Sequence, residues 1–347
     1  MKAALVGTGR VAAQHLACLS ALPGVTLGGV CDLSPGAAAA AAERYGAPAF
    51  TDVGAMLGSV RPDVVHITTP APTHFALARA ALEGGAHVLV EKPAAESHED
   101  VTALLELAQA CGRIVVEDYN YVWDPAVVEI RDRVADGTLG DVRHVEVSIA
   151  LDLFAAGSRY RDRDSPHPAL AHPAGVVSEF VTHLASLAHV FIGPHGAVES
   201  VWRRTGPDGE IGELRALVQG AHATAALSFS ATSRPDGFTL RVAGTRMRAS
   251  ARLFDRRLTL TRPPRHGLPR PIGSLANDLA EGVAAARSGF AAFYEKLAGR
   301  PGSYAGLWAL VERTYDALAH GTPPPVSHAD IAEVNALVAA VVGGAPR

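Results

Sequence analysis

A glycine-rich turn near the start of the sequence has residue types that suit the binding of a phosphate group. The segment Gly7-Thr8-Gly9-Arg10-Val11-Ala12 follows an apolar, strand-like run and precedes a helical pattern. Its first glycine permits a tight turn, its second lets the backbone approach a diphosphate, and its small alanine allows close packing of helix and strand. Amide groups at the start of such a helix attract anions. The turn predicts a dinucleotide site, and a βα turn without a ligand is the alternative.

Asp32 ends the second apolar run, close to the spacing that the dinucleotide pattern expects. A carboxylate in this place accepts hydrogen bonds from the adenosine ribose hydroxyls and repels a 2′-phosphate. The following residues, Leu33-Ser34-Pro35-Gly36, supply no arginine or lysine that would bind such a phosphate. The sequence therefore predicts NAD(H) as the cofactor in preference to NADP(H).

A lysine suited to acid/base chemistry follows a later apolar run. Lys92 lies between Glu91 and Pro93 at the carboxyl end of a predicted strand, where ligands bind in open α/β sheets. Hydride transfer to or from carbon requires a proton to move at the attached oxygen. An ammonium group can hydrogen-bond this oxygen and stabilise developing alkoxide charge. We predict Lys92 as the acid/base, and a solvated lysine after a strand is the alternative.

A carboxylate and an imidazole have the spacing of neighbours on one helix face. Glu179 and His183 are four residues apart at the start of a helical pattern over 176–191. The carboxylate could orient the imidazole and favour its charged form. We predict that both residues serve the reaction, and an ordinary ion pair on a helix surface is the alternative.

Other histidines and cysteines have simpler interpretations. His167 and His172 resemble metal ligands only superficially, because no third ligand is evident, and no metal site is predicted. Their loop, residues 155–173, is interpreted as a substrate-gating loop or a plain turn. His15 and Cys18, on the first predicted helix, are interpreted as packing residues.

The elements that would position these residues alternate between strand and helix over the first 120 or so residues. Five apolar runs are typical of strands buried on both faces of a parallel sheet: Lys2–Val6, Thr26–Asp32, Asp63–Thr69, His87–Glu91 and Arg113–Tyr119. Helical segments between them begin with cap signals at Ser34-Pro35 and at Ser97-x-x-Asp100. We predict an α/β fold in which residues 1–121 form a Rossmann domain, a doubly wound parallel sheet that binds the dinucleotide.

Residues 122–347 have a different pattern, which predicts a second α/β domain for substrate binding and oligomerisation. A helix from Asp124-Pro125 to about Asp136 precedes a run of alternating apolar residues from Val145 to Leu153. Further strands are expected at 197–204, 213–219, 223–231, 238–243, 246–254 and 257–262. Further helices are expected at 176–191, 274–287, 303–319 and 328–342. Short polar turns between the strands indicate a large, open and mostly antiparallel sheet with helices on one face.

Composition limits the classes of partner. A chain of 347 residues with 48% hydrophobic and 19% charged residues suits two globular domains. The net charge of -4 and the short, proline-broken arginine stretches at 246–257 and 261–270 argue against nucleic-acid binding. No signal peptide or membrane-spanning run is recognised, so no membrane partner is expected. Three scattered cysteines suit a reducing, cytoplasmic compartment.

Several of these motifs together resemble one protein family. Thr68-Thr-Pro-Ala-Pro-Thr-His74, the Glu91-Lys92-Pro93 tripeptide and Gly175-x-x-x-Glu179-x-x-x-His183 follow the glycine-rich turn in order. In this combination the chain resembles the glucose–fructose oxidoreductase / inositol dehydrogenase / rhizopine-catabolism (Gfo/Idh/MocA) family over essentially its whole length. The resemblance implies a Rossmann domain, a second α/β domain with an open sheet, and redox chemistry on sugars, cyclitols or related hydroxyl and carbonyl compounds.

The resemblance also assigns roles to positions in this chain. It places Lys92 beside the nicotinamide and substrate, and Glu179 and His183 in the substrate pocket. Together with the glycine-rich turn, it predicts these cofactor-binding residues: Gly7, Thr8, Gly9, Arg10, Val11, Asp32, Thr69, Pro70, His74, Glu91, Lys92 and Asn120. The chain departs from the family pattern at Glu179, where aspartate is common, at Val181, where glycine is common, and at Ser186, where aspartate is frequent.

Three functions are consistent with these motifs. The first is an NAD-dependent dehydrogenase or reductase, with Lys92 as the acid/base, that forms a homodimer or homotetramer through the free face of the second sheet. The second is a non-catalytic NAD sensor on the same fold. The third is a glycosidase that uses tightly held NAD as a transient hydride store. The presence of both Lys92 and His183 favours the first.

Overall fold

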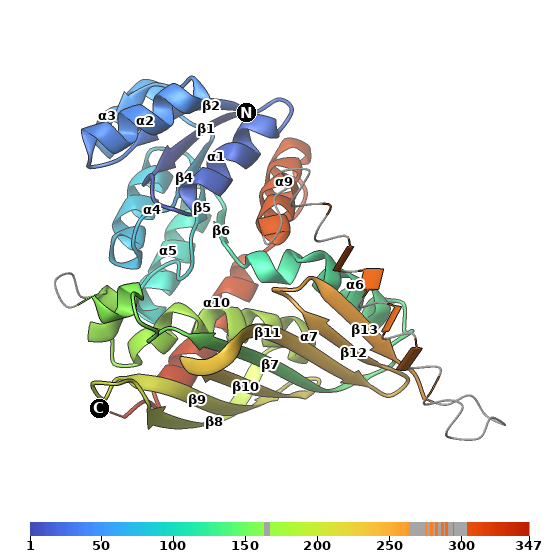
Figure 1. Ribbon diagram of the computed structural model, residues 1–347. Helices are drawn as coiled ribbons and strands as arrows, with labels where there is room; N and C mark the ends of the chain where they lie inside the picture. Colours follow the sequence, from blue (N-terminus) through green and yellow to red (C-terminus); the bar gives the residue numbers. More distant parts are fainter. Residues whose placement is uncertain are drawn as a thin grey trace. The chain divides into compact units, whose positions relative to one another are not determined.

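The structure is a computed structural model that describes residues 1–162, 167–263 and 304–346, with a few further residues between 275 and 294 (Figure 1). It divides into two compact units. The first comprises Met1–Asn120 and Gly306–Asn335, and the second comprises Tyr121–Ala305 and Ala336–Arg347. The segment Gly306–Asn335 thus belongs to the first unit, whereas the sequence predicts an uninterrupted second domain from 122 to 347.

Hydrogen bonds over long sequence separations account for this return of the chain to the first unit. Tyr315 bonds through its hydroxyl to His66 Nε2 at 3.0 Å. The amide of Asn335 donates to Glu117 Oε2 at 2.8 Å, within the same unit. Such pairings join residues more than 200 positions apart, and no local sequence pattern reveals them.

The first unit contains a parallel sheet of six strands in the order β3-β2-β1-β4-β5-β6. These strands are β1 Lys2–Val6, β2 Thr26–Cys31, β3 Ala49–Phe50, β4 Val64–Ile67, β5 His87–Val90 and β6 Val115–Glu117. All five predicted strands are present, and β3 is an additional one of only two residues, too short to show a hydrophobic period. This order reverses direction between β1 and β4, which is the switch point of a doubly wound sheet.

Helices surround this sheet, and the predicted cap signals are used. They are α1 Ala12–Ala21, α2 Pro35–Tyr45, α3 Val53–Val60, α4 His74–Glu83, α5 His98–Ala110 and α9 Ala305–His320, with a short 3₁₀ turn η1 at Ala71–Thr73. The Ser34 hydroxyl accepts from Ala37 N at 3.4 Å. The Ser97 hydroxyl accepts from Asp100 N at 3.0 Å. Both contacts satisfy an amide that a helix start would otherwise leave unpaired.

The second unit contains a sheet of seven strands in the order β13-β12-β11-β7-β10-β9-β8. They are β7 Val142–Asp152, β8 His195–Arg204, β9 Ile211–Gly220, β10 Thr224–Ser230, β11 Thr232–Gly244, β12 Arg248–Arg252 and β13 Arg257–Thr261. Every pairing is antiparallel except that of β7 with β10, which is parallel. The prediction of a mostly antiparallel sheet is confirmed.

Helix α7, Val181–Ile192, packs against β7 and β10 on one face of this sheet. The remaining helical segments in or entering this unit are η2 Asn120–Trp123, α6 Pro125–Ala135, η3 Arg159–Arg161, η4 Pro168–Ala171, η5 Gly175–Glu179 and α10 His328–Val342. The predicted single helix over 176–191 is wrong, because η5 ends at Glu179 and α7 begins at Val181. The predicted helix at 274–287 lies largely outside the described residues.

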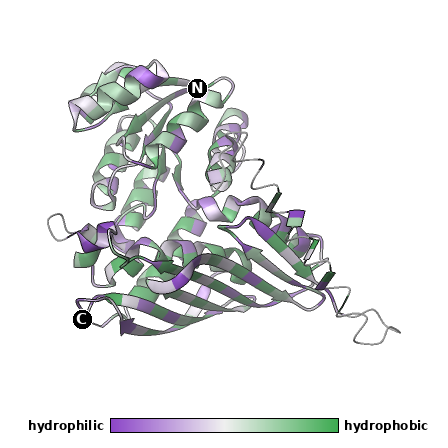
Figure 2. Cartoon of the chain, viewed as in Figure 1, coloured by the Kyte–Doolittle hydropathy of each residue, from purple (hydrophilic) through white to green (hydrophobic). Residues whose placement is uncertain are grey.

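The two sheets differ in how hydrophobic and hydrophilic residues are distributed along their strands (Figure 2). Strands of the first sheet are apolar along their length, and β4 is buried at all four positions. In β9, buried Leu214, Ala216 and Val218 alternate with the exposed Arg215 and Leu217. The second sheet therefore has one packed face and one accessible face, as its period of two predicts. No helix in the described ranges is long and apolar enough to cross a membrane.

Candidate active site

The glycine-rich turn connects β1 to α1 and has one glycine that the fold requires. Gly7 has φ +89°, and a Cβ on it would lie 2.6 Å from Thr69 Cγ2 and 2.9 Å from Thr69 N. Gly9 is exposed, and a Cβ there would meet nothing closer than Thr68 O at 4.0 Å. Val11 is the N-cap of α1 and supplies no side-chain cap, while the neighbouring Arg10 is exposed. The turn thus presents open space and uncapped amides at a helix start.

Asp32 follows β2 and is held by its neighbours. Thr8 donates to Asp32 Oδ2 through both its amide and its hydroxyl, each at 2.7 Å. Ser34 N donates to the other oxygen at 2.9 Å. Partial burial acts to raise the pKa of Asp32, but these hydrogen bonds outweigh it and hold the pKa below its usual value. The result is an ionised carboxylate beside the turn.

Thr69, Pro70 and His74 lie after β4, at the switch point of the sheet. His74 is buried, and its two ring nitrogens contact backbone oxygens at 2.7 Å each, those of Thr69 and Pro93. Its imidazole therefore ties the loop after β4 to the loop after β5. Through this contact His74 supports the segment that carries Lys92.

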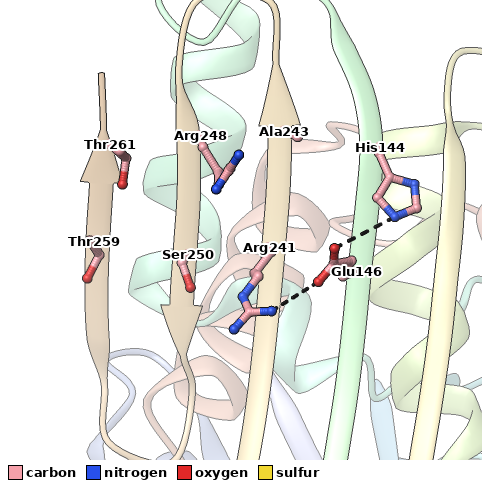
Figure 3. A pocket seen from close by; sticks show the side chains of 8 residues that line it. All are labelled: His144, Glu146, Arg241, Ala243, Arg248, Ser250, Thr259 and Thr261. Carbon is pink, nitrogen blue, oxygen red and sulfur yellow. Dashed lines mark hydrogen bonds and ion pairs between the residues drawn. The ribbon is translucent and has the colours of Figure 1, made fainter. Parts of the chain in front are cut away.

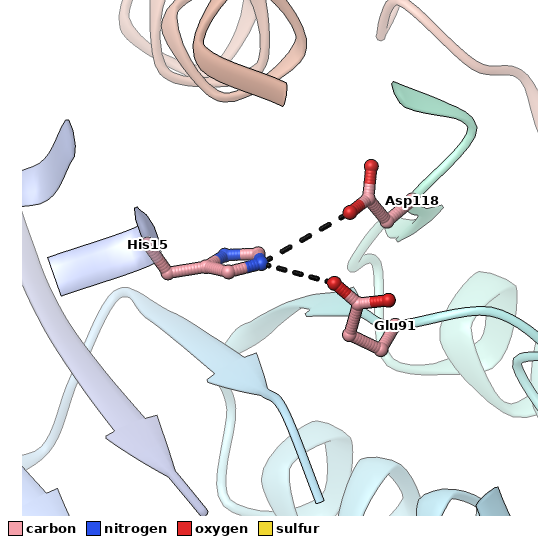
Figure 4. A group of neighbouring side chains, drawn as sticks. All are labelled: His15, Glu91 and Asp118. Carbon is pink, nitrogen blue, oxygen red and sulfur yellow. Dashed lines mark hydrogen bonds and ion pairs between the residues drawn. The ribbon is translucent and has the colours of Figure 1, made fainter. Parts of the chain in front are cut away.

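Glu91 and Lys92 follow β5 directly, and both are partly buried. His15 Nε2 lies 3.3 Å from Glu91 Oε1 and 4.0 Å from Asp118 Oδ2 (Figure 4). Burial acts to raise the pKa of Glu91, yet hydrogen bonding and charge from His15, with smaller contributions from Asp118 and Lys92, lower it to about 2. His15 is buried as predicted, but it also bonds to the candidate site and is more than a packing residue.

Two further carboxyl groups lie at the end of β6: Glu117 is its last residue and Asp118 follows it. The sequence did not identify either of them as a site residue. Burial raises the pKa of Glu117 to about 7, although hydrogen bonds from Asn335 and Tyr119 oppose the increase. Burial also raises the pKa of Asp118 well above its usual value, and the Glu91 carboxylate adds to the effect. Two adjacent acids at the end of an apolar strand were the available signal, since buried acids need a reason to be there.

Asn120 lies close to these carboxyl groups. It is partly buried, and its backbone N–H donates a hydrogen bond to Asp118. The structure therefore brings Glu91, Lys92 and Asn120 to the carboxyl edge of the sheet that also carries Gly7 and Asp32.

The second unit holds Glu179 and His183, but on separate helical segments. His183 lies in α7 and packs edge-on against Tyr121, with ring centroids 4.9 Å apart. Glu179 ends η5, so the two residues do not share one continuous helix face. The expected i, i+4 relation of the pair is therefore wrong, although the partial burial of Glu179 and burial of His183 suit site residues.

Residues of the loop at 155–173 hold the Glu179 carboxylate. Tyr160 donates its hydroxyl to Glu179 Oε2, and Arg159 Nη2 donates to the same oxygen at 3.1 Å. His167 Nε2 lies 3.6 Å from Glu179 Oε1. Burial and this carboxylate raise the pKa of the Tyr160 phenol, while burial lowers the pKa of His167. The sequence interpretation missed Tyr160 and Arg159, because no local motif marks them.

A hollow on the accessible face of the second sheet has a different character (Figure 3). Arg241 Nη1 pairs with Glu146 Oε2 at 3.1 Å, and His144 Nε2 lies 3.9 Å from Glu146 Oε1. None of the site residues predicted from the sequence lines this hollow. Exposed charges that already pair with one another indicate a solvated surface rather than an active site.

The residues of the first unit fit a dinucleotide. Open space lies beside Gly9, and a Cβ on this residue would fill it. The space lies before the start of α1, which has no side-chain cap, and such a helix start binds phosphate groups. The ionised Asp32 stands after the neighbouring strand, where ribose hydroxyls are bound in this class of sheet. Gly7 to Val11 and Asp32 would hold the dinucleotide, and Lys92 would lie toward its reactive end. The first unit has the architecture of a Rossmann-type dinucleotide-binding domain.

Comparison with known proteins agrees with this class. Residues 1–119 match the family model described as "Oxidoreductase family, NAD-binding Rossmann fold", the Gfo/Idh/MocA model. Over residues 1–119 the chain thus matches the NAD-binding part of this family, and the resemblance noted in the sequence is confirmed over this stretch.

Curated relatives match over a similar stretch. D-glucoside 3-dehydrogenase of Escherichia coli (strain K12) is 33% identical over 144 residues, which is 41% of this chain and 41% of that protein. Inositol 2-dehydrogenase of Rubrobacter xylanophilus is 35% identical over 138 residues, which is 39% of this chain and 40% of that protein. The matched part thus spans about two fifths of these relatives.

Solved structures share the fold over nearly the full chain. Levoglucosan dehydrogenase in complex with NADH superposes with a TM-score of 0.79, covers 99% of this chain and 96% of its own, and is 19% identical. At this identity the likeness shows the fold, including that of the second unit. The predicted α/β architecture with two different sheets is confirmed.

Proposed function

We propose that this protein is an NAD-dependent oxidoreductase that transfers hydride between the nicotinamide and a sugar, cyclitol or related hydroxyl or carbonyl compound. The observation that carries the proposal is the placement of Lys92 on the edge of the sheet that also bears the Gly7–Val11 turn and Asp32. The names of the curated relatives, a glucoside dehydrogenase and an inositol dehydrogenase, support this substrate class.

Lys92 is the acid/base in this proposal. The nicotinamide, when bound, supplies or accepts the hydride. Lys92 hydrogen-bonds the substrate oxygen, stabilises its developing negative charge and exchanges its proton. His74 supports the Lys92 segment through Pro93 O. Thr69, Pro70, Glu91 and Asn120 complete the cofactor-binding set.

Glu179 and His183 bind and orient the substrate in this proposal. His183 packs edge-on against Tyr121, and aromatic walls of this kind suit the apolar face of a sugar ring. Glu179, held by Tyr160 and Arg159, offers carboxylate oxygens to hydroxyl groups. His183 keeps the histidine of the family pattern, while Glu179 stands where aspartate is common.

The preference for NAD over NADP rests on Asp32. An ionised carboxylate attracts ribose hydroxyls and repels a 2′-phosphate. Hydrogen bonds from Thr8 and Ser34 keep Asp32 ionised and fix its orientation. The cofactor set therefore favours NAD.

We further propose that the protein is a cytoplasmic homodimer or homotetramer that uses the accessible face of the second sheet. Val201 and Leu217 are large apolar side chains that are 67% and 64% exposed on β8 and β9. Apolar groups on an accessible sheet face commonly contact another subunit. Light scattering on the purified protein measures the oligomeric state, and a monomer would contradict this assignment.

The test of the proposed function is a screen for NAD+ reduction with a panel of polyols and sugars, and for NADH oxidation with keto-sugars. Lys92→Met should lower turnover by about two to four orders of magnitude and leave NAD+ binding intact. Lys2→Met is the matched control, because Lys2 opens β1 at the opposite end of a parallel strand and binds Val60 O at 2.8 Å. Near-normal turnover of Lys92→Met would remove Lys92 from the mechanism.

Other outcomes of the same screen decide between the remaining hypotheses. Tight NAD+ binding without redox chemistry on any compound would support a non-catalytic sensor. Cleavage of aryl glycosides by protein that retains NAD, with no net NADH formation, would support a glycosidase. Both results would contradict a dehydrogenase.

A further inference from the structure

An unusual density of buried carboxyl groups surrounds Lys92. The charge of Lys92 acts on three of them: it contributes to the lowered pKa of Glu91, and it opposes the burial that raises the pKa of Glu117 and of Asp118. Glu117 and Asp118 are 0% and 1% exposed, and the Glu91 side chain is 14% exposed. At most two positive charges, those of Lys92 and His15, face these three carboxyl groups away from water, so part of the cluster holds a proton.

Glu91 and Asp118 form a hydrogen-bonded pair within this cluster. Each brings an oxygen to a point where it and His15 Nε2 all lie within 4.8 Å of one another (Figure 4). Hydrogen bonding between the two carboxyl groups lowers the pKa of Glu91 and raises the pKa of Asp118. Buried carboxyl groups in such contact share one proton, because two adjacent negative charges repel each other.

A chain of buried rings leads to this pair through His15. Tyr315 OH lies 3.0 Å from His66 Nε2, and His66 Nδ1 lies 2.9 Å from His15 Nδ1. Burial and the charge of His15 lower the pKa of His66 well below its usual value, so its ring is neutral. If His66 donates to His15 Nδ1, or if His15 is charged, His15 Nε2 carries a proton and donates to Glu91. Each contact then has one donor and one acceptor.

This arrangement leaves Glu91 as the acceptor and Asp118 as the holder of the proton. Glu91 receives hydrogen bonds from both His15 and Asp118. A further positive charge next to the cluster would favour loss of the remaining proton, since an opposite charge stabilises a carboxylate. The oxidised nicotinamide carries such a charge, and the reduced ring does not.

We propose that the Glu91–Asp118 pair is a proton store coupled to the redox state of the cofactor. It releases one proton when the oxidised ring binds beside Lys92 and regains one when that ring is reduced. In an oxidation, the C–H electron pair leaves the substrate as hydride and forms NADH, while the hydroxyl proton passes by way of Lys92 to the Asp118 carboxylate. The alcohol, NAD+ and the ionised Glu91–Asp118 pair thus give the carbonyl product, NADH and the pair with one proton, so atoms and charge balance.

The proposal rests on the proposed NAD site but is tested without a substrate. NAD+, NADH and ADP-ribose, which lacks the nicotinamide, are titrated into the full-length protein by calorimetry in two buffers of different ionisation heats. The buffer dependence of the heat measures the protons released. About pH 8.5 is suitable, because Glu117, with a pKa of about 7, is then ionised before binding. NAD+ should release about half to one proton more than NADH or ADP-ribose does.

Two variants identify the group that releases the proton. Asp118→Asn should bind NAD+ and lose the difference between NAD+ and NADH, whereas Glu117→Gln, the matched control, should keep it. Equal proton release by NAD+ and NADH in the unaltered protein overturns the proposal, and it does so even where Asp118→Asn fails to fold. Loss of the difference in Glu117→Gln alone assigns the proton to Glu117 and also overturns it. If none of the three ligands binds, the proposed function itself fails.

Discussion

Gly7 and Gly9 belong to the same turn, but the structure predicts that replacing them has opposite consequences. Gly7→Ala puts a Cβ 2.6 Å from Thr69 Cγ2 at a residue with φ +89°. A left-handed backbone costs a residue with a Cβ about 1–2 kcal/mol. Overpacking at a rigid contact costs about 1–3 kcal/mol more. We therefore expect Gly7→Ala to lower the free energy of unfolding by about 2–5 kcal/mol.

Gly9→Ala is the matched control for stability. Its φ lies outside the left-handed range, and its Cβ would have no protein atom closer than 4.0 Å. The unfolding free energy should change by less than about 0.5 kcal/mol. The same Cβ would enter the space in which a diphosphate approaches the backbone, so the Kd for NAD+ should rise by at least about tenfold.

Urea denaturation followed by circular dichroism measures the stabilities, and calorimetric titration with NAD+ measures the affinities. The expected pattern is a destabilised Gly7→Ala and a stable Gly9→Ala that binds NAD+ poorly. A Gly7→Ala protein as stable as the parent would refute the reading of the Thr69 contact. A Gly9→Ala protein with unchanged affinity would refute the placement of the diphosphate.

Three further predictions concern single residues. Asp32→Asn removes the negative charge but keeps the shape of the side chain. In calorimetric titrations, the ratio of the Kd for NADP+ to the Kd for NAD+ should fall by about tenfold. An unchanged ratio would show that charge repulsion does not set the cofactor preference. Ser97→Ala removes the cap of α5 and should cost about 1 kcal/mol in urea denaturation, whereas no loss would contradict the contact with Asp100 N. Burial holds the pKa of His66 well below its usual value, so the unfolded chain binds a proton below about pH 6.5 that the folded chain does not. This contribution to stability is lost as pH falls, by about 1.4 kcal/mol per pH unit, and the loss should be absent in His66→Gln; equal pH slopes for the two proteins would contradict it.

Local patterns in the sequence determine much of the first unit. Buried parallel strands are apolar along their length, so the runs that became β1, β2, β4, β5 and β6 are recognisable by themselves. A helix N-cap is also a local interaction, because it joins residues three positions apart. Ser34 and Ser97 cap their helices as the sequence predicts. The Gly7–Val11 turn and Asp32 are predictable for the same reason, because adjacent residues carry the whole signal.

The second unit shows where local patterns become insufficient. The alternating strands predict an antiparallel sheet, but the parallel pairing of β7 with β10 depends on how distant strands meet. The apolar pattern over 176–191 predicts one helix, whereas the chain changes from a 3₁₀ turn to an α-helix at Phe180. Both conformations place apolar residues on one side at a similar spacing, so hydrophobic periodicity alone does not separate them.

Only the tertiary structure determines the surroundings of Lys92. The sequence alone predicts the position of Lys92 after an apolar strand. The contact of His15 with Glu91, however, joins residues 76 positions apart, and the contact of His66 with Tyr315 joins residues 249 positions apart. Asp118 becomes a buried partner of Glu91 because β5 and β6 are adjacent in the sheet. Charge interactions and burial depend on distances in space. The sequence therefore determines which residue types are available for chemistry, while the fold determines their protonation states.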